Sequence, residues 1–247
     1  MTSVRLTVVM PVYNEAAALS AVLGDITTHV LDSVTDCELL VVDDNSTDAS
    51  TSILADAQSR DPRIRVLSNS ANLGHGPSVR RGIDESTSEW ILHLDSDGQF
   101  DLAEFPRLWE LADDHDLVLG IRSERHDPFH RIVLTQATRA LASVLSRHRV
   151  RDANTPFRLV RRSLFDHLRP AIPADTFAPA IAVVIGAYRS GARVTDVEVT
   201  HLARPHGRST LRVGRLARAA ATSALQTIVI SSRRFSPFTA QSGSADA

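Results

Sequence analysis

Apolar runs typical of buried β-strands alternate with helix-like segments through the first half of the chain, and this alternation restricts the fold more than any other feature. The expected strands are residues 4–10, 38–43, 64–67, 90–94 and 116–120. The expected helices are residues 16–30, 49–58, 77–86 and 102–112. Strands separated by single helices form right-handed crossovers and a mostly parallel sheet. We therefore predict an α/β fold in which helices flank one mostly parallel central sheet, in a single domain.

Polar clusters directly follow four of the expected strands. They comprise residues 13–15, 43–46, 69–76 and 95–99. In open α/β sheets, ligands bind beyond the carboxyl ends of the strands. Because the carboxyl ends of parallel strands share one edge, the sequence predicts a binding site built from these clusters.

The second half of the chain is less regular. We expect helices at residues 131–149, 177–189 and 211–230, and strands at residues 156–160 and 193–199. The last of these helices is amphipathic and basic, with Arg212, Arg215 and Arg218 among apolar residues, and the small polar residues 231–247 predict a disordered tail. Residues 1–210 then form the main domain. The basic helix could lie on an anionic membrane surface, or it could pack on its own domain or on a second subunit of a homodimer.

The sequence shows no pattern of a membrane span or a targeting segment. Its longest uncharged apolar stretch, residues 177–188, is well below the ~20 residues that a span requires. The segment from Met1 to Met10 differs from a signal peptide. We expect a cytoplasmic protein, soluble or peripheral on the inner membrane face.

Charge is divided unevenly along the chain. Residues 1–120 hold 21 Asp and Glu against 7 Arg, a net charge of −14, whereas residues 121–247 hold 8 against 20, a net charge of +12. Such a division of charge suits a protein that binds a metal ion and phosphates together. Two oppositely charged surfaces that only face solvent would give the same charge counts. All 27 cationic residues are Arg, which excludes lysine Schiff-base chemistry and a P-loop. Cys37 is the single cysteine, which excludes a disulfide framework and cysteine-based metal sites.

The sharpest chemical signal is the segment Asp95-Ser96-Asp97-Gly98-Gln99. Two carboxylates at positions i and i+2 after a buried strand can turn toward one hard cation, and oxygen ligands suit Mg²⁺ or Mn²⁺. Such pairs also decorate loops that bind nothing, so the position after a strand is what favours a metal site. The ten histidines show no His-x-x-x-His spacing, and we therefore expect no zinc site.

Asp43 and Asp44 follow another strand. A carboxylate at this point could accept a hydrogen bond from a base or a ribose, while the alternative is a helix start capped by Ser46 and Asp48. The loop at residues 72–76 carries two glycines before a helix. A dinucleotide-binding loop would follow the first strand, whereas this loop follows the third. We therefore interpret its glycines as points where the backbone closely approaches a ligand or a neighbouring strand.

Arginines gather at two places in the second half. Arg122, Arg125 and Arg131 follow the fifth expected strand, and Arg204 and Arg208 lie near the end of the main domain. A single arginine is usually a solvated surface charge, but forked guanidinium groups at this density predict contacts with a diphosphate or a phosphorylated acceptor.

Several motifs, taken in order, resemble glycosyltransferase family 2. They are Met10-Pro-Val-Tyr-Asn-Glu15, Val41-Val-Asp-Asp-Asn-Ser46, Asn72-Leu-Gly74, Asp95-Ser-Asp-Gly-Gln99, Gly120-Ile-Arg122, Arg131, Asp152, Phe157-Arg158 and Arg204-x-x-Gly-Arg-Ser209. Together they are similar to the dolichol-phosphate mannose synthase and bacterial polyprenyl-phosphate glycosyltransferase branch. The resemblance covers roughly residues 4–210. It implies a GT-A fold, an inverting transfer and a nucleotide-diphosphate sugar donor, GDP- or UDP-linked.

The resemblance also implies roles for individual residues. Nucleotide-sugar binding is expected of Pro11, Tyr13, Glu15, Asp43, Asp44, Gly74, Asp95 and Ser96, and metal binding of Asp95, Asp97 and Gln99. Acceptor and phosphate binding is expected of Arg122, Arg131, Thr135, Arg204 and Arg208. For catalysis we expect Asp97 and Arg122, together with the two carboxylates Asp152 and Asp175.

Three departures from that branch concern the acceptor. The branch usually has Ser-Gly-Phe where this chain has Thr155-Pro156-Phe157, it has Lys where Arg208 stands, and many bacterial members carry membrane helices that are missing here. A polyprenyl phosphate is largely dianionic at neutral pH and needs no general base. A sugar or other hydroxyl needs a carboxylate base, for which Asp175 is the first candidate and Asp152 the second, unless Asp175 merely caps a helix.

We predict polyprenyl phosphate as the acceptor, with a soluble hydroxyl acceptor in polysaccharide or secondary-metabolite glycosylation as the alternative. A non-catalytic nucleotide-sugar binder is a third hypothesis, which the intact acidic segment disfavours. No nucleic-acid partner is expected.

Overall fold

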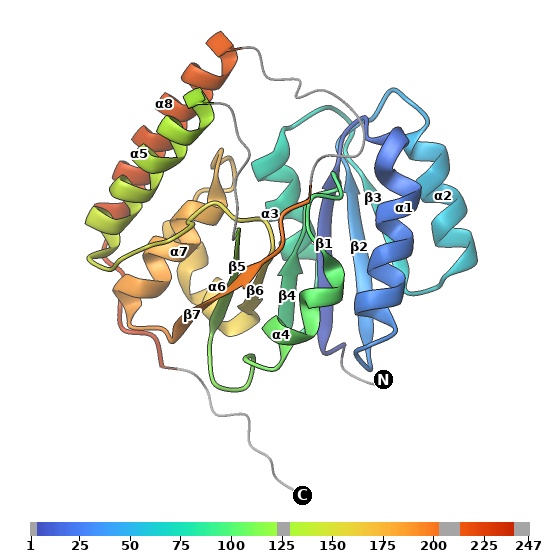
Figure 1. Cartoon of the computed structure of the whole chain (residues 1–247), viewed down its shortest axis with the longest axis horizontal. Helices are drawn as coiled ribbons and strands as arrows, with labels where there is room; N and C mark the ends of the chain where they lie inside the picture. The colour runs from blue at the N-terminus through green and yellow to red at the C-terminus, as the bar shows by residue number, and fades with distance from the viewer. Residues whose placement is uncertain (1–3, 123–128, 203–212, 240–247) are drawn as a thin grey trace, which may run out of the picture.

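A seven-stranded sheet forms the centre of the computed structural model, which describes residues 4–122, 129–202 and 213–239, with the backbone alone for residues 129–134 and 213–220 (Figure 1). The strand order is β3-β2-β1-β4-β6-β5-β7. Only β6 runs antiparallel to its neighbours, so the sheet is mostly parallel as predicted. The strands are β1 Leu6–Val12, β2 Cys37–Asp43, β3 Ile64–Ser68, β4 Trp90–His93, β5 Leu117–Arg122, β6 Arg158–Arg161 and β7 Val194–Val199.

Helices connect most of the strands. They are α1 Ala16–Ile26, α2 Ser50–Arg60, α3 His75–Glu85, α4 Phe105–Trp109, α5 Phe129–Ser146, α6 Arg162–Leu168, α7 Pro179–Ser190 and α8 Val213–Ser231. The helix expected at residues 16–30 continues beyond α1 only as a π-helical turn, Thr27–Leu31. The helix expected at residues 102–112 is shorter, because Pro106 has no N–H to donate and occupies the first turn of α4 after a separate 3₁₀ turn.

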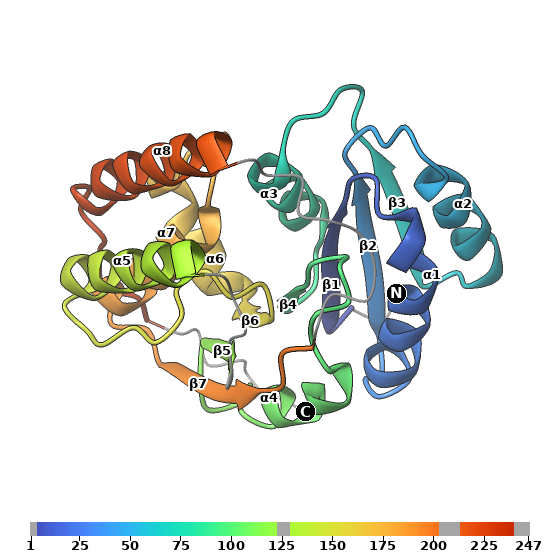
Figure 2. The ribbon, with the colours of Figure 1, turned by 45° about the horizontal axis from the view of Figure 1, so that its top comes forward.

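Two hydrophobic cores cover the two faces of the sheet, and strand alternation assigns side chains to them. On β1, Leu6, Val8 and Met10 face the first core, whereas Val9 faces the second. The first core is covered by α1, α2 and α4, and the second by α3, α6 and α7. Helices α5 and α8 lie side by side on the outer surface of the second core (Figure 2).

The C-terminal region is more ordered than the sequence predicts. On α8, Ile230 is buried in the second core, so one face of this helix packs on its own domain, which is one of the alternatives that the sequence leaves open. The prediction of a disordered tail from residue 231 is wrong up to residue 239. Phe235 and Phe238 pack against the second core, and Phe238 N donates to Ser190 O at 2.8 Å. Two aromatic side chains bury enough apolar surface to hold a segment whose average composition is polar. Residues 240–247 lie outside the described part of the chain.

Across the described residues, every helix falls short of the length or the hydropathy needed to cross a membrane.

Candidate active site

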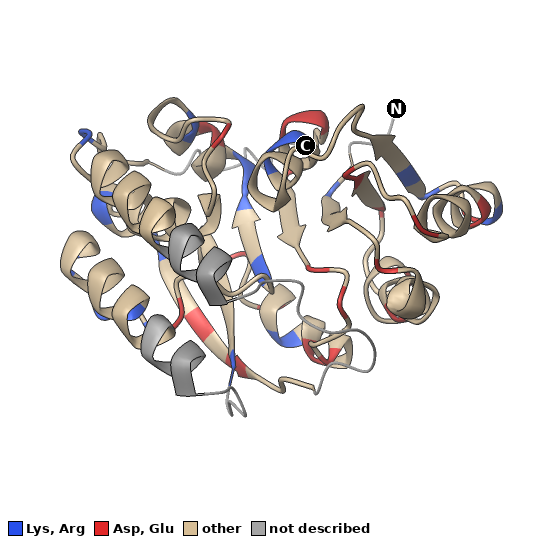
Figure 3. Cartoon of the chain, turned by 90° about the horizontal axis from the view of Figure 1, so that it is seen from above, with Lys and Arg blue, Asp and Glu red and all other residues tan. Residues whose placement is uncertain are grey.

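The carboxyl ends of β1, β2 and β4 lie side by side at one edge of the sheet. Val12 on β1 pairs with Asp43 on β2, and Val9 on β1 pairs with His93 on β4. Figure 3 looks onto this edge, with acidic residues red and arginines blue. The structure thus brings together the polar clusters that follow these strands, at residues 13–15, 43–46 and 95–99, and the cluster at residues 69–76 follows the adjoining strand β3.

Pro11 stands where β1 and β4 separate. The ladder between these strands ends at Val9 and His93, and Leu94 N then donates to Val9 O at 3.1 Å. Because alternate residues of a strand face opposite neighbours, the nitrogen of Pro11 faces the β4 side, as Val9 does. Proline has no N–H to leave unpaired there. The strands therefore diverge without an unsatisfied backbone donor, and such a divergence is where open sheets bind ligands.

Asp43 is buried, and its carboxylate organises its own loop. Oδ1 accepts a hydrogen bond from Ser46 N at 3.0 Å, and Oδ2 accepts one from Thr51 Oγ1 at 3.0 Å. Capping falls to Asp48, which accepts from Ser50 N at 2.9 Å at the start of α2 and from Ala16 N at 3.1 Å at the start of α1. Asp48, one of the two expected caps, therefore binds the first backbone N–H of both helices, although the N-cap positions themselves are Ala49 and Glu15.

Asp44 is also buried, and it holds the loop that follows β3. Its Oδ1 accepts from Asn69 Nδ2 at 2.7 Å and from Leu73 N at 2.8 Å, and its Oδ2 accepts from Gly74 N at 2.8 Å. Gly74 has φ of +94°, which glycine adopts without strain, and it precedes the first residue of α3. Asp44 thereby fixes the start of α3 relative to the end of β2.

Tyr13 is presented outward by a tight turn at the end of β1. The next residue, Asn14, has φ of +54°, and its Oδ1 accepts from Thr47 N at 2.7 Å. Glu15 N donates to Ser50 Oγ at 3.0 Å. These contacts tie the turn to the loop after β2 and leave the ring of Tyr13 45% exposed.

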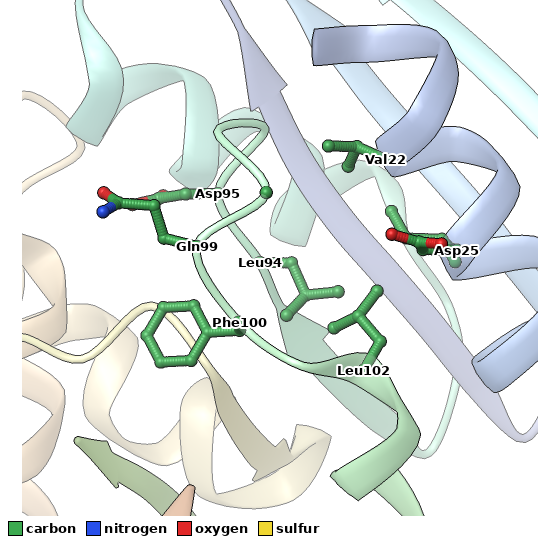
Figure 4. Close-up of a pocket in the computed structure, with 9 residues that line it drawn as sticks. Val22, Asp25, Leu94, Asp95, Gln99, Phe100 and Leu102 are labelled. Atoms are coloured by element: carbon green, nitrogen blue, oxygen red, sulfur yellow. The ribbon is translucent and has the colours of Figure 1, made fainter. Parts of the chain in front are cut away.

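The loop that follows β4 carries the expected metal ligands. Ser96 is buried, whereas Asp95, Asp97 and Gln99 remain partly exposed. Gly98 adopts φ of +67°, and Asp97 Oδ1 accepts from Gln99 N at 3.2 Å, so the loop turns back on itself. Figure 4 shows Asp95 and Gln99 extending to the same side of this loop. The carboxylate and amide oxygens are the donors that Mg²⁺ and Mn²⁺ prefer, so the residues present suit such an ion.

Two histidines that sequence reasoning did not single out lie against Asp95. His75 Nε2 is 2.9 Å and His93 Nε2 is 3.8 Å from Asp95 Oδ1. Burial alone would raise the pKa of Asp95, but the nearby His75, His93 and Arg122 lower it overall, so the carboxylate is ionised. Burial and the charge of Arg158 keep the pKa of His93 well below its ordinary value. The position of His93 directly before the acidic loop was the one signal in the sequence that could have drawn attention to it.

Arginines approach the acidic loop from the second half of the sheet. Arg122 ends β5, with its guanidinium over the ring of Phe100 at 5.7 Å and its Nε 3.9 Å from Oδ2 of buried Asp152. Arg158 begins β6, where it pairs in register with His93, and burial lowers its pKa to about 10. Within the described part of the chain, Nε and Nη1 of Arg158 find no hydrogen-bond partner. The structure thus places Arg122 beside Asp152, and it sets Arg158 of the Phe157-Arg158 motif next to His93 in the sheet.

The remaining acceptor residues are placed only in part. Thr135 lies half-buried on α5, and Arg131 belongs to the same helix, but its side chain lies outside the description. Arg204 and Arg208 lie outside the described residues. Asp175 is exposed and precedes α7 by four residues, so it is not the cap of that helix.

The segment beside Asp175 packs closely on the start of α3. A Cβ added at Gly76 would lie 2.2 Å from Thr176 O and 2.6 Å from Phe177 O. This close backbone approach explains the glycine. It also brings Asp175 to the side of the site where His75 lies.

The profile described as "Glycosyl transferase family 2" matches residues 7–169. An undecaprenyl-phosphate 4-deoxy-4-formamido-L-arabinose transferase of Aeromonas hydrophila is 30% identical over 213 residues, covering 84% of this chain and 63% of the relative. The protein of that name from Yersinia pestis is 28% identical over 215 residues, covering 86% and 64%. The chain thus spans a little under two thirds of the length of these relatives.

Solved structures share the fold. A glucosyl-3-phosphoglycerate synthase of Mycobacterium tuberculosis with phosphoglyceric acid has a TM-score of 0.70 at 18% identity, covering 92% of this chain and 79% of that one. A mannosyltransferase of Pyrobaculum calidifontis with GDP-Man and Mn²⁺ has a TM-score of 0.60 at 16% identity, covering 94% and 74%. These likenesses confirm the expected GT-A fold. The family match, which covers residues 7–169, shows that the chain belongs to glycosyl transferase family 2.

Proposed function

We propose that the protein transfers a hexosyl group, with inversion, from a nucleotide-diphosphate sugar to a polyprenyl phosphate. The observation that carries this proposal is the meeting of the acidic loop after β4 with Arg122 from β5 at one edge of the sheet. Similar proteins support both substrates. The curated relatives are named for transfer involving undecaprenyl phosphate, and solved structures of similar fold hold UDP with Mn²⁺ or GDP-Man with Mn²⁺.

The donor would occupy the divergence between β1 and β4. Tyr13 offers an exposed ring against which a base can stack, while Asp43 and Asp44 hold the neighbouring loops in place. Asp95, Asp97 and Gln99 would hold Mg²⁺ or Mn²⁺ beside the diphosphate. When bound, such an ion offsets the negative charge that develops on the leaving nucleoside diphosphate.

The acceptor phosphate would approach from the side of β5. Arg122 would orient one phosphate oxygen toward the anomeric carbon, and Thr135, Arg131, Arg204 and Arg208 stay sequence-based predictions for the phosphate contacts. A new bond forms between that oxygen and the anomeric carbon as the bond to the diphosphate breaks. Because the dianionic phosphate brings its own nucleophilic oxygen, neither Asp152 nor Asp175 has to remove a proton.

Helix α8 supports action at a membrane surface, where a polyprenyl acceptor resides. Its outward residues Leu225, Ile228 and Val229 are 65%, 46% and 57% exposed. We place this face against the inner leaflet. Co-sedimentation with anionic vesicles tests this placement. We expect the wild type to bind the vesicles and Leu225→Glu to lose that binding. If the wild type instead forms a dimer that dissociates in Leu225→Glu, the face belongs to a contact with a second subunit.

Product analysis tests the reaction itself. The protein is incubated with UDP- and GDP-sugars, Mn²⁺ and either undecaprenyl phosphate or soluble sugars, and lipid-linked sugar and free nucleoside diphosphate are measured. We expect lipid-linked product, a loss of at least about 100-fold in Asp97→Asn, and full activity in the surface control Asp56→Asn. Transfer to soluble sugars alone would overturn the proposed acceptor.

Substitution of Asp175 also distinguishes a phosphate acceptor from a hydroxyl acceptor. With a phosphate acceptor, Asp175→Asn should keep near-normal turnover because no general base is needed. A loss of about 100-fold or more in this variant, restored by a more acidic acceptor hydroxyl, would indicate the alternative hydroxyl acceptor.

A further inference from the structure

Two imidazoles and one carboxylate converge at the site edge from three separate positions in the chain. His75 is the first residue of α3, His93 is the last residue of β4, and Asp95 follows two residues later. One ligand atom from each of the three lies within 4.8 Å of the other two. The rings of His75 and His93 are tilted by 49°, with centroids 5.6 Å apart, so both Nε2 atoms can point at Asp95 Oδ1.

His93 gives the second observation. Its side chain is only 4% exposed, yet within the described part of the chain its Nε2 has no hydrogen-bond partner. A buried imidazole nitrogen without a partner is costly unless something else occupies its lone pair. His93 Nε2 lies 3.8 Å from Asp95 Oδ1, so a metal ion bound between them would supply the missing partner.

We propose that His75, His93 and Asp95 bind one transition-metal ion of the Zn²⁺ class through two imidazole nitrogens and one carboxylate oxygen. This donor set differs from the all-oxygen set of Asp97 and Gln99. Imidazole ligands favour Zn²⁺ and its neighbours in the first transition row, whereas Mg²⁺ and Ca²⁺ favour oxygen. With three protein ligands, a tetrahedral ion keeps one position open.

The three ligand atoms lie within 4.8 Å of one another, and a bound ion would draw them closer together. Ligand atoms around tetrahedral Zn²⁺ lie ~3.3 Å apart, since each is about 2.0–2.1 Å from the metal. The two separations to Asp95 are 2.9 Å and 3.8 Å, on either side of that value. His75, with 53% of its side chain exposed, has the freedom to adjust. The positive charge of Arg158 nearby is offset by Asp152 and by Asp95 itself.

The proposed site goes against the expectation that the chain has no zinc site. That expectation relied on short spacings between histidines, whereas these ligands are brought together by the start of α3 and the end of β4. Since Asp95 is shared with the proposed donor site, one consequence rests on the proposed function: Zn²⁺ should inhibit transfer supported by Mn²⁺ or Mg²⁺. Binding of Zn²⁺ itself does not depend on that function.

The test is a direct metal titration of the full chain, freed of metal with a chelator. Zn²⁺ is titrated in competition with a chromophoric chelator, and Co²⁺ is added separately to record its visible absorption, which reports imidazole ligation in low coordination. We expect one Zn²⁺ per chain. Binding should weaken by about tenfold or more in His75→Asn, which replaces an exposed side chain and should not disturb folding.

Matched variants complete the experiment. His93→Leu should abolish the Co²⁺ absorption, with its fold checked by circular dichroism, and His29→Asn, which lies outside the cluster, should bind like the wild type. Equal Zn²⁺ affinity in wild type and His75→Asn, or absence of the Co²⁺ signal in wild type, would overturn the proposal. Sugar transfer with Mn²⁺ is measured on the same samples, so a failure of the proposed function would appear there and not in the titration.

Discussion

Arg122 and Asp152 face each other across the basic side of the site, with Nε of the arginine 3.9 Å from Oδ2 of the carboxylate. Asp152 is buried, while the Arg122 side chain keeps 21% of its surface exposed. The carboxylate therefore steadies the base of the guanidinium and leaves its outer nitrogens able to meet a ligand. A guanidinium held in this way suits the phosphate contact proposed for Arg122.

Substitution of Arg122 tests that assignment. Arg122→Ala should reduce kcat/KM for the phosphate acceptor by about 100-fold or more, and Arg122→Lys should restore part of it, because an ammonium group keeps the charge but loses the fork. Steady-state kinetics with varied acceptor measures the effect. Arg60→Ala, on the exposed face of α2, is the control, and equal losses in both variants would contradict the assignment.

Asp44→Asn should destabilise the loop between β3 and α3. The substitution keeps the shape of the side chain but removes an acceptor oxygen, so at least one of the donors from Asn69, Leu73 and Gly74 loses its partner. An unpaired buried donor costs about 1–3 kcal/mol. Urea unfolding should show a loss of this size, and limited proteolysis should cut near residues 70–74 sooner than in wild type. Unchanged stability would mean that the loop is held by other contacts.

Gly76→Ala and Gly24→Ala should have opposite effects. At Gly76 the new methyl group would lie 2.2 Å and 2.6 Å from two backbone oxygens. Because a backbone oxygen cannot move without its whole segment, we expect the free energy of unfolding to fall by about 1–3 kcal/mol. At Gly24, inside α1, nothing lies within 4 Å of the added Cβ, and alanine should stabilise the helix by about 0.5–1 kcal/mol. Thermal unfolding of the two variants under one condition measures both. A stabilising Gly76→Ala would refute the close packing of residues 176 and 177 on α3.

Cys37 should make stability depend on pH in the alkaline range. Burial raises the pKa of its thiol to about 12, while the unfolded chain ionises at its ordinary pKa of ~8.5. Above about pH 9 the unfolded state therefore binds fewer protons than the native state, and the free energy of unfolding should fall by about 1.4 kcal/mol per pH unit. The chain has two tyrosines and no lysine, so few other groups titrate there. Urea unfolding of wild type and Cys37→Ala between pH 8 and 11 gives the free energy of unfolding of each as a function of pH. We expect the two curves to converge as the pH rises. Parallel curves would contradict the raised pKa of Cys37.

The order of strands and helices was predictable because β-branched runs and punctuating polar clusters are local signals. Residues 38–43 and 64–67, for example, became β2 and β3 with changes of at most one residue at each end. The antiparallel direction of β6 was not predictable, because it depends on where the chain re-enters the sheet. Helix α6, with seven residues, is too short to show a periodic pattern.

The acidic part of the site was predictable for the same reason, since Asp95 and Asp97 follow a strand directly. The position of His75 was not, because it depends on contacts between distant segments, and the motif Phe157-Arg158 gave no sign that Arg158 lies beside His93. Arg158 looks like a surface charge in its sequence window, yet register with His93 places it 3% exposed inside the sheet. Only pairing between β4 and β6 brings the two together.

The single antiparallel strand β6 sets how far the two halves of the site stand apart. Adjacent strands are about 4.8 Å apart, so one intervening strand holds the ends of β4 and β5 ~10 Å from each other. In the proposed reaction, this distance leaves room for a sugar ring between two phosphate-bearing molecules that would repel each other at contact. Because backbone hydrogen bonds set this distance, side-chain variation would change the sugar specificity of the proposed reaction without changing the distance.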